Sequence, residues 1–187
     1  MSARTKGASR RDWSPLAWPA AVAFATLAGT LATSCMMPLV ALAASISATM
    51  PGRRGASTLF AAWAGNQLLG FWLLNYPATA YTFAWGGALL GAAGIAWLVA
   101  GAVVGGRGEL VASRLAAGFV AAFLAYEAVL CGFASIVGGL ETFTPGIVAR
   151  IALNETIWFA SLLALRVILT SGAPTWFGAP VRLRLLG

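Results

Sequence analysis

Two long stretches of this chain contain no charged residue, and both are too long for a single membrane-spanning helix. Residues 16–50 and 55–106 hold no Asp, Glu, Lys or Arg. One helix needs roughly 20 apolar residues to cross the hydrocarbon core of a bilayer. Each stretch therefore predicts two spans joined by a tight turn. A chain with 60% hydrophobic and 9% charged residues is also far from the composition of a soluble domain.

Turn signals divide the whole chain into six apolar segments. We place these at 13–34, 38–50, 57–74, 81–104, 110–137 and 146–170, the second being short. The predicted fold is all-α: a polytopic membrane protein built as a bundle of six transmembrane helices. Residues 1–12 form a basic cytoplasmic tail, 13–171 the six-helix transmembrane domain and 172–187 a second cytoplasmic or interfacial tail. Gly172, Pro174 and Pro180 are expected to keep this second tail non-helical.

The basic residues favour one direction of threading. Lys and Arg collect on the cytoplasmic side of membrane proteins. With six spans, one side of the membrane receives ten of them, and the three loops on the other side contain none: Arg4, Lys6, Arg10, Arg11, Arg53, Arg54, Arg107, Arg114, Arg182 and Arg184. Both termini are therefore expected in the cytoplasm, and the protein is expected in a bacterial cytoplasmic membrane.

Several classes of function are disfavoured by what the chain lacks. The net charge of +7 does not indicate nucleic-acid binding, because the basic residues flank apolar segments and do not alternate with aromatic residues in a polar region. The chain has no His and only Cys35 and Cys131, so no zinc spacing or bis-histidine haem site is present. We expect no metal, no cofactor and no catalytic residue, since no Ser or Cys has a His base.

Polar groups within the spans are the candidate binding site. Polar side chains are costly in a bilayer, so each needs a partner or a function. On the predicted threading, those of the third, fifth and sixth spans all fall between the midplane and the outer surface. Aromatic residues border the same region, and together the groups suit a flat heterocyclic ligand. The candidate ligand residues are Asn66, Gln67, Tyr76, Tyr81, Trp85, Glu127, Arg150, Asn154, Glu155 and Trp158.

Structural roles are the alternative for each of these residues. Asn and Gln hydrogen-bond between membrane helices, and Trp and Tyr anchor helices at the interface. Glu127 and Arg150 can also form an ion pair, depending on how their helices are rotated. Clustering at one depth favours a site over purely structural contacts.

The first span carries a second pattern, a strip of small residues. Ala21, Ala25 and Gly29 recur every four residues, and such a strip lets another helix approach closely. The strip indicates either internal packing or docking to another membrane subunit.

By these features the chain resembles the substrate-binding S component of energy-coupling-factor vitamin transporters. The six-span layout, Ala21-x-x-x-Ala25 and the outer polar cluster carry the resemblance. It implies a subunit that binds a small vitamin-like molecule from outside, with a corrinoid as one candidate. It also implies docking, through the strip on the first helix, to a transmembrane coupling subunit and its ATPase. The chain has no Gly-x-x-x-x-Gly-Lys-Ser/Thr loop of its own.

Two other functions remain open. One is a self-standing, proton-coupled carrier that uses Glu127 and Glu155. The other is a membrane assembly or accessory protein that transports nothing, in which the polar cluster only stabilises helix contacts.

Overall fold

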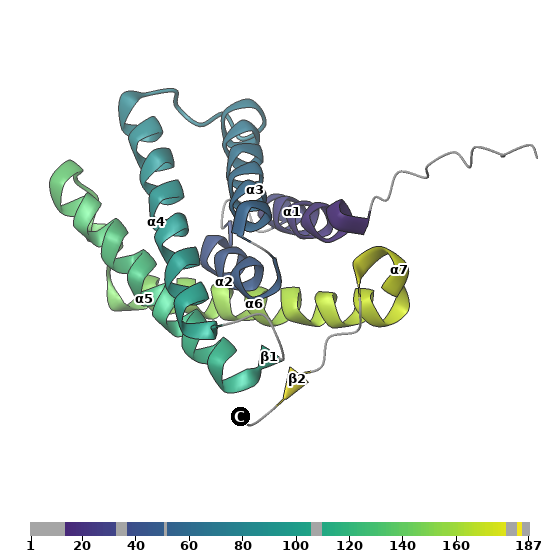
Figure 1. Ribbon diagram of the computed structural model, residues 1–187. Coiled ribbons are helices and arrows are strands. Elements are labelled where there is room, and N and C mark those ends of the chain that lie inside the picture. Colours follow the sequence, from purple (N-terminus) through teal and green to yellow (C-terminus); the bar gives the residue numbers. More distant parts are fainter. Residues whose placement is uncertain (1–13, 33–36, 51, 106–109, 179–182, 185–187) are drawn as a thin grey trace, which may run out of the picture.

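The computed structural model describes residues 14–32, 37–50, 52–105, 110–178 and 183–184. These residues are almost entirely helical (Figure 1). The helices are α1 (Ser14–Ala32), α2 (Leu39–Thr49), α3 (Gly52–Trp72), α4 (Ala80–Val104), α5 (Ala112–Val137), η1 (Leu140–Thr142), α6 (Pro145–Gly172) and α7 (Pro174–Phe177). Two-residue strands, β1 (Leu110–Val111) and β2 (Leu183–Arg184), form one short parallel bridge.

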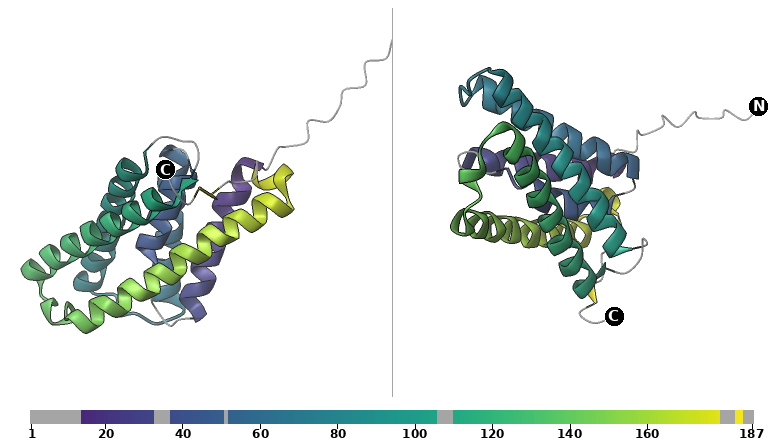
Figure 2. Two further views of the ribbon diagram at one scale, coloured as in Figure 1. Left: turned by 90° about the horizontal axis from the view of Figure 1, so that it is seen from below. Right: turned by 90° about the vertical axis from the view of Figure 1, so that its left-hand side faces the viewer.

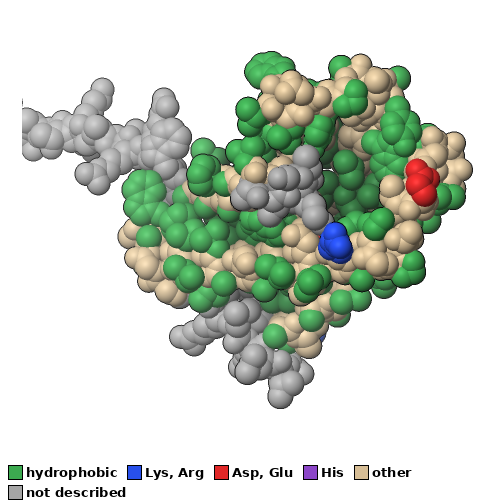
Figure 3. Space-filling view, turned by 180° about the vertical axis from the view of Figure 1, so that it is seen from behind, with side chains coloured by type: hydrophobic (Ala, Val, Ile, Leu, Met, Phe, Trp, Pro, Cys, Tyr) green, Lys and Arg blue, Asp and Glu red, His purple; other side chains and the backbone are tan. Residues whose placement is uncertain are grey.

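Three helices, α4, α5 and α6, are long and apolar enough to cross a membrane, and α1 and α2 contain shorter apolar stretches. The outward-facing surface agrees with this character. Phe24, Trp72 and Ile136 are 75%, 83% and 83% exposed, and the face seen in Figure 3 is largely hydrophobic, with charged side chains only at isolated points. The helices therefore support an integral membrane protein. They do not by themselves show six complete spans.

α2 lies at the centre of the bundle (Figures 1 and 2). Every residue from Leu39 to Ile46 is buried, and the apolar character of α2 on all sides is compatible with this central position. Its neighbours are α3, α4, α5 and α6. At about 1.5 Å per residue, its 11 residues extend roughly 16 Å, about half of a hydrocarbon core. The expected second span is therefore a short internal helix.

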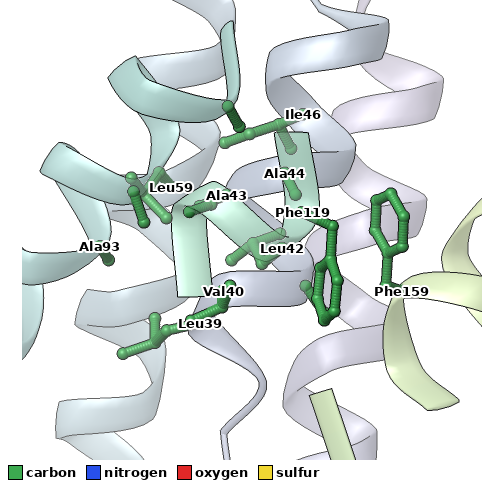
Figure 4. Close-up of a cluster of buried hydrophobic side chains, with 14 of the residues drawn as sticks. Leu39, Val40, Leu42, Ala43, Ala44, Ile46, Leu59, Ala93, Phe119 and Phe159 are labelled. Carbon is green, nitrogen blue, oxygen red and sulfur yellow. The ribbon is translucent and has the colours of Figure 1, made fainter. Parts of the chain in front are cut away.

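Small residues allow the neighbours of α2 to approach closely. On α4, Ala92, Ala93, Ala96 and Ala100 have no exposed surface. Larger side chains close the core on the other sides (Figure 4). The rings of Phe119 on α5 and Phe159 on α6 stack with centroids 4.7 Å apart.

The ends of the helices follow local sequence signals. Thr79 caps α4, its hydroxyl oxygen accepting the Thr82 N–H at 3.2 Å, and Thr144 precedes the first residue of α6, Pro145, a position that suits proline. Gly138 and Gly139 terminate α5 with φ values of 95° and 112°, which glycine adopts without strain.

Two expectations about helix boundaries are wrong. Arg53 and Arg54 lie in the first turn of α3, and not in a loop before it. Their long side chains are compatible with helix, and no proline blocks a start at Gly52. The tail after Gly172 is not wholly non-helical, because Pro174 occupies the first position of the one-turn helix α7, where its missing N–H costs nothing. The residues of the 1–12 tail, together with Cys35, Arg107, Pro180 and Arg182, lie outside the described residues.

Candidate functional site

A cavity of about 290 Å³ opens beside the N-terminus of α2. Its walls come from the start of α2, from α3, α4, α5 and α6, and from the loop that contains η1. The described lining residues are Met37, Leu39, Asn66, Trp85, Leu89, Tyr126, Glu127, Leu130, Thr142, Phe143, Ile147, Ile151, Asn154 and Glu155. The cavity is mostly apolar with a few polar groups, as small-molecule sites usually are, and its volume is near the lower end of their range.

Half of the predicted ligand residues line this cavity: Asn66, Trp85, Glu127, Asn154 and Glu155. They lie on four different helices, so only the tertiary structure brings them together. These five residues are therefore close together in space.

Glu155 has a clear structural role. It is 3% exposed, and its Oε2 accepts the backbone N–H of Ala41 at 2.7 Å. The amide of Val40 also interacts with this carboxylate. The first amides of a helix have no partner within the helix, and here Leu39 N–H donates to the Met37 carbonyl at 2.9 Å while Leu42 N–H donates to that of Pro38. Glu155 thereby completes the cap of a buried helix end.

Four other polar side chains line the cavity without a hydrogen bond to any described residue. They are Asn66, Tyr126, Glu127 and Asn154. Tyr126 is only 6% exposed, yet it lines the cavity together with Glu127 and Glu155. The indole Nε1 of Trp85 is also buried with no hydrogen-bond partner. Of the four, only Tyr126 is buried, whereas Asn66, Glu127 and Asn154 are half-buried. Buried polar groups are nearly always paired, so the buried Tyr126 and the unpaired Trp85 Nε1 beside one cavity are compatible with a polar ligand there.

Aromatic contacts hold Trp85 in place. Its ring meets Phe133 edge-on with centroids 5.1 Å apart and Tyr81 at 6.3 Å. The Tyr81 hydroxyl donates to the Gly138 carbonyl at 3.4 Å, which joins the start of α4 to the end of α5. Tyr81 therefore supports the wall behind Trp85 and does not itself line the cavity.

The other predicted ligand residues also lie away from the cavity. The side-chain carbonyl of Gln67 lies against Gly86 of α4, and the Tyr76 ring lies against Gly70. Trp158 packs on α1 at Gly29, and Arg150 is exposed on the surface of α6. Gln67, Arg150 and Trp158 lie on faces of their helices that do not reach the cavity.

The possible ion pair between Glu127 and Arg150 does not form. Within the described residues, neither side chain has an ion-pair or hydrogen-bond partner. Glu127 faces the cavity, while Arg150 lies on the exposed side of α6. The carboxylate of Glu127 is therefore left uncompensated by any described basic side chain.

The small-residue strip of α1 faces the inside of the molecule in part. Gly29 is buried, and a Cβ there would collide with the Trp158 ring. Ala21 and Ala25 are half-buried against the core. Internal packing accounts for Gly29, and only Ala21 and Ala25 retain surface for another subunit.

Several cavity residues were not predicted. Tyr126 precedes Glu127, and the helix rotation turns both toward the cavity. Phe143 and Thr142 follow α5 in a loop that no periodic pattern describes. The position of Tyr126 next to Glu127 could have identified it as a cavity residue. Nothing in the sequence indicated that the η1 loop forms part of the cavity wall.

Arg166 lies near the opposite end of α6. Its guanidinium stacks on the Trp18 ring at 4.9 Å from the centroid, and Nε and Nη1 are buried without a hydrogen-bond partner. Trp18 in turn donates from Nε1 to the Thr49 Oγ1 at 3.0 Å. Arg166 therefore packs against α1.

No metal site is evident in the part of the chain that the structure describes, where no three acidic, Cys or His side chains come together. Comparison with protein-family models, curated proteins and solved structures finds no match to this chain.

Proposed function

We propose that this protein is a membrane-embedded binding subunit for a small organic molecule, acting in uptake across a bacterial cytoplasmic membrane. The observation that carries the proposal is the cavity, in which Asn66, Tyr126, Glu127 and Asn154 have no partner among the described residues. Tyr126 is buried beside this cavity, and so is the unpaired Nε1 of Trp85. Purely structural contacts between helices would pair such groups, since an unpaired buried polar group costs roughly 1–3 kcal/mol.

The volume of the cavity limits the size of the ligand. About 290 Å³ equals roughly ten water molecules at about 30 Å³ each. A molecule on the order of 10–20 non-hydrogen atoms suits this space. A corrinoid is many times larger, and we do not propose one.

An energy source outside this chain is part of the proposal. The resemblance to S components suggests a separate ATP-driven module, and the sequence contains no phosphate-binding loop. Contact with a coupling subunit would use the half-buried Ala21 and Ala25, because Gly29 is occupied by Trp158.

The decisive experiment is native mass spectrometry on the full-length protein, extracted gently from its own membrane. Ile151→Trp fills the cavity from α6, and Leu153→Trp is its control, because Leu153 is 63% exposed on the same helix. We expect a bound small molecule in the wild type and in Leu153→Trp, and its loss from Ile151→Trp with an unchanged melting temperature. Wild-type protein without any bound molecule, or a ligand that Ile151→Trp retains, would contradict the proposal.

Reconstitution separates this proposal from the self-standing carrier. Proteoliposomes that contain only this chain should bind the molecule identified above without concentrating it, with or without a proton gradient. Accumulation driven by the gradient alone would establish the proton-coupled carrier instead.

A further inference from the structure

The cavity wall carries acidic but no basic side chains. Among its described lining residues, Glu127 and Glu155 are the only ones that can be charged. Arg150 lies one turn before Asn154 on α6 but is exposed and outside the lining. Any charge on the ligand will therefore interact first with carboxylates.

The two carboxylates are not equivalent. Glu155 accepts the Ala41 N–H at 2.7 Å and lies at the N-terminus of α2, where the helix dipole stabilises a negative charge. Glu127 lies half-buried on α5 and has no such group within the described residues. A buried charge without a partner is unfavourable, so Glu127 is the group that a ligand would satisfy.

Tyr126 adds independent support for an occupant beside Glu127. This side chain is more than nine-tenths buried and lines the cavity, and its hydroxyl has no hydrogen-bond partner among the described residues. Tyr126 is next to Glu127 in the sequence and lines the same cavity as Glu127 and Glu155. A donor group on the ligand that reaches Glu127 will also be close to this hydroxyl.

The remaining walls suit the rest of such a molecule. Trp85 and Phe143 provide aromatic surface, which attracts cations as well as flat rings. The amides of Asn66 and Asn154 can orient a polar ring through their oxygen or nitrogen atoms. An anionic ligand would find the same amides but would be repelled by Glu127.

We propose that the cavity selects a small organic cation, a flat molecule whose protonated amine or charged nitrogen heterocycle pairs with Glu127. This inference rests on the proposed binding function and narrows its ligand class.

The test uses three probes with the same ring and nearly the same size. Tryptamine is a cation, tryptophol is neutral and indole-3-acetate is an anion. Their affinities for the purified full-length protein are measured by isothermal titration calorimetry. We expect tryptamine to bind at least about tenfold more tightly than tryptophol, and indole-3-acetate most weakly. Tryptophol or indole-3-acetate binding as tightly as tryptamine would overturn the inference.

Variants assign the selectivity to one side chain. Glu127→Gln keeps the shape but removes the charge, and should abolish the preference for tryptamine over tryptophol. Glu141→Gln is the control, since Glu141 is exposed on η1 outside the cavity, and should retain the full preference. A preference for tryptamine that survives in Glu127→Gln would overturn the assignment of the selectivity to Glu127. If that variant does not fold, the comparison of the three probes on the wild-type protein decides the ligand class.

The outcomes separate this inference from the proposed function. Equal affinity for all three probes, abolished by Ile151→Trp, keeps the binding function and overturns the cation selectivity. If no probe binds, the molecule found by native mass spectrometry decides: a cation supports the inference, and a neutral or anionic molecule overturns it. No probe binding and no native ligand would overturn both proposals.

Discussion

The Glu155 carboxylate on α6 accepts a hydrogen bond from the Ala41 backbone N–H at 2.7 Å, although these residues are 114 positions apart. Helix caps usually come from the residue just before the helix, but here that residue is Pro38, which supplies no side-chain hydrogen bond. A distant side chain replaces the local cap and joins α6 to the central helix. The same carboxylate forms part of the cavity wall, so the stability of the core and the shape of the site are linked at this residue.

Removal of the Glu155 carboxylate should destabilise the protein. In Glu155→Ala the buried amide of Ala41 loses its acceptor, and we expect a loss of about 1–3 kcal/mol in stability. Glu155→Gln should recover much of this loss, because its side-chain carbonyl can still accept the N–H. Thermal unfolding in detergent measures both, with the exposed Glu141→Ala as the control. Equal melting temperatures for Glu155→Ala and wild type would show that the cap contributes nothing.

The contact between Gly29 and Trp158 makes a prediction about α1. A side chain at Gly29 would occupy the position of the Trp158 ring, so Gly29→Ala should cost about 1–3 kcal/mol through overpacking. Trp158→Leu in the same chain should restore part of the loss by making room. Ala28→Leu is the control, because Ala28 is exposed on α1. A Gly29→Ala protein that melts like wild type but fails to hold a membrane partner would instead identify Gly29 as a docking residue.

Trp85→Phe should leave the stability of the empty protein nearly unchanged. Its buried indole N–H has no partner, so the substitution removes no hydrogen bond and keeps an aromatic ring against Phe133. The matched comparison is Trp63→Phe, which removes a hydrogen bond from Nε1 to the Gly86 carbonyl at 2.9 Å and should cost about 1 kcal/mol.

The two Trp variants also differ in their effect on binding. Retention of the native ligand in mass spectrometry should fall in Trp85→Phe and not in Trp63→Phe, since only Trp85 lines the cavity. The opposite ranking, in stability or in ligand retention, would contradict the role given to the Trp85 indole.

Cysteine labelling of intact cells tests the threading. In a chain carrying Cys35→Ser and Cys131→Ser, Glu141→Cys should react with a membrane-impermeant maleimide added outside, because the loop before α6 is expected on the outer side. Arg54→Cys, at the start of α3, should react only after the cells are lysed. Labelling of Arg54→Cys in intact cells would reverse the orientation inferred from the basic residues.

The residues around individual helix ends contain most of the information about where helices begin and end. Asn75 adopts φ 55° in the turn after α3, as its place before Tyr76 and Pro77 predicts. The start of α3 is the exception, since a third segment that begins at residue 57 leaves Arg53 and Arg54 outside the helix, although Arg favours helix. Their charge favours a position near the membrane surface but does not determine the local backbone conformation.

The candidate site was only partly predictable. Glu127 and Asn154 lie in the cavity, as expected, while Arg150, one turn from Asn154, does not. Sequence position determines depth along a helix, but rotation about the helix axis depends on packing with neighbours. α6 is nearly uniform in hydrophobicity around its circumference, so its sequence indicates no preferred inward side.

Composition and charge distribution are sufficient to predict an all-helical protein with helices long and apolar enough to cross a membrane, because apolar length and flanking charge act locally along the chain. The central place of α2, the cap that Glu155 gives it and the cavity lined by five helices required the three-dimensional structure. These features depend on which faces of apolar helices meet, and many pairings of apolar faces bury similar area. Shape complementarity between small and large side chains, such as Gly29 and Trp158, selects among them, and that selection involves residues far apart in the chain.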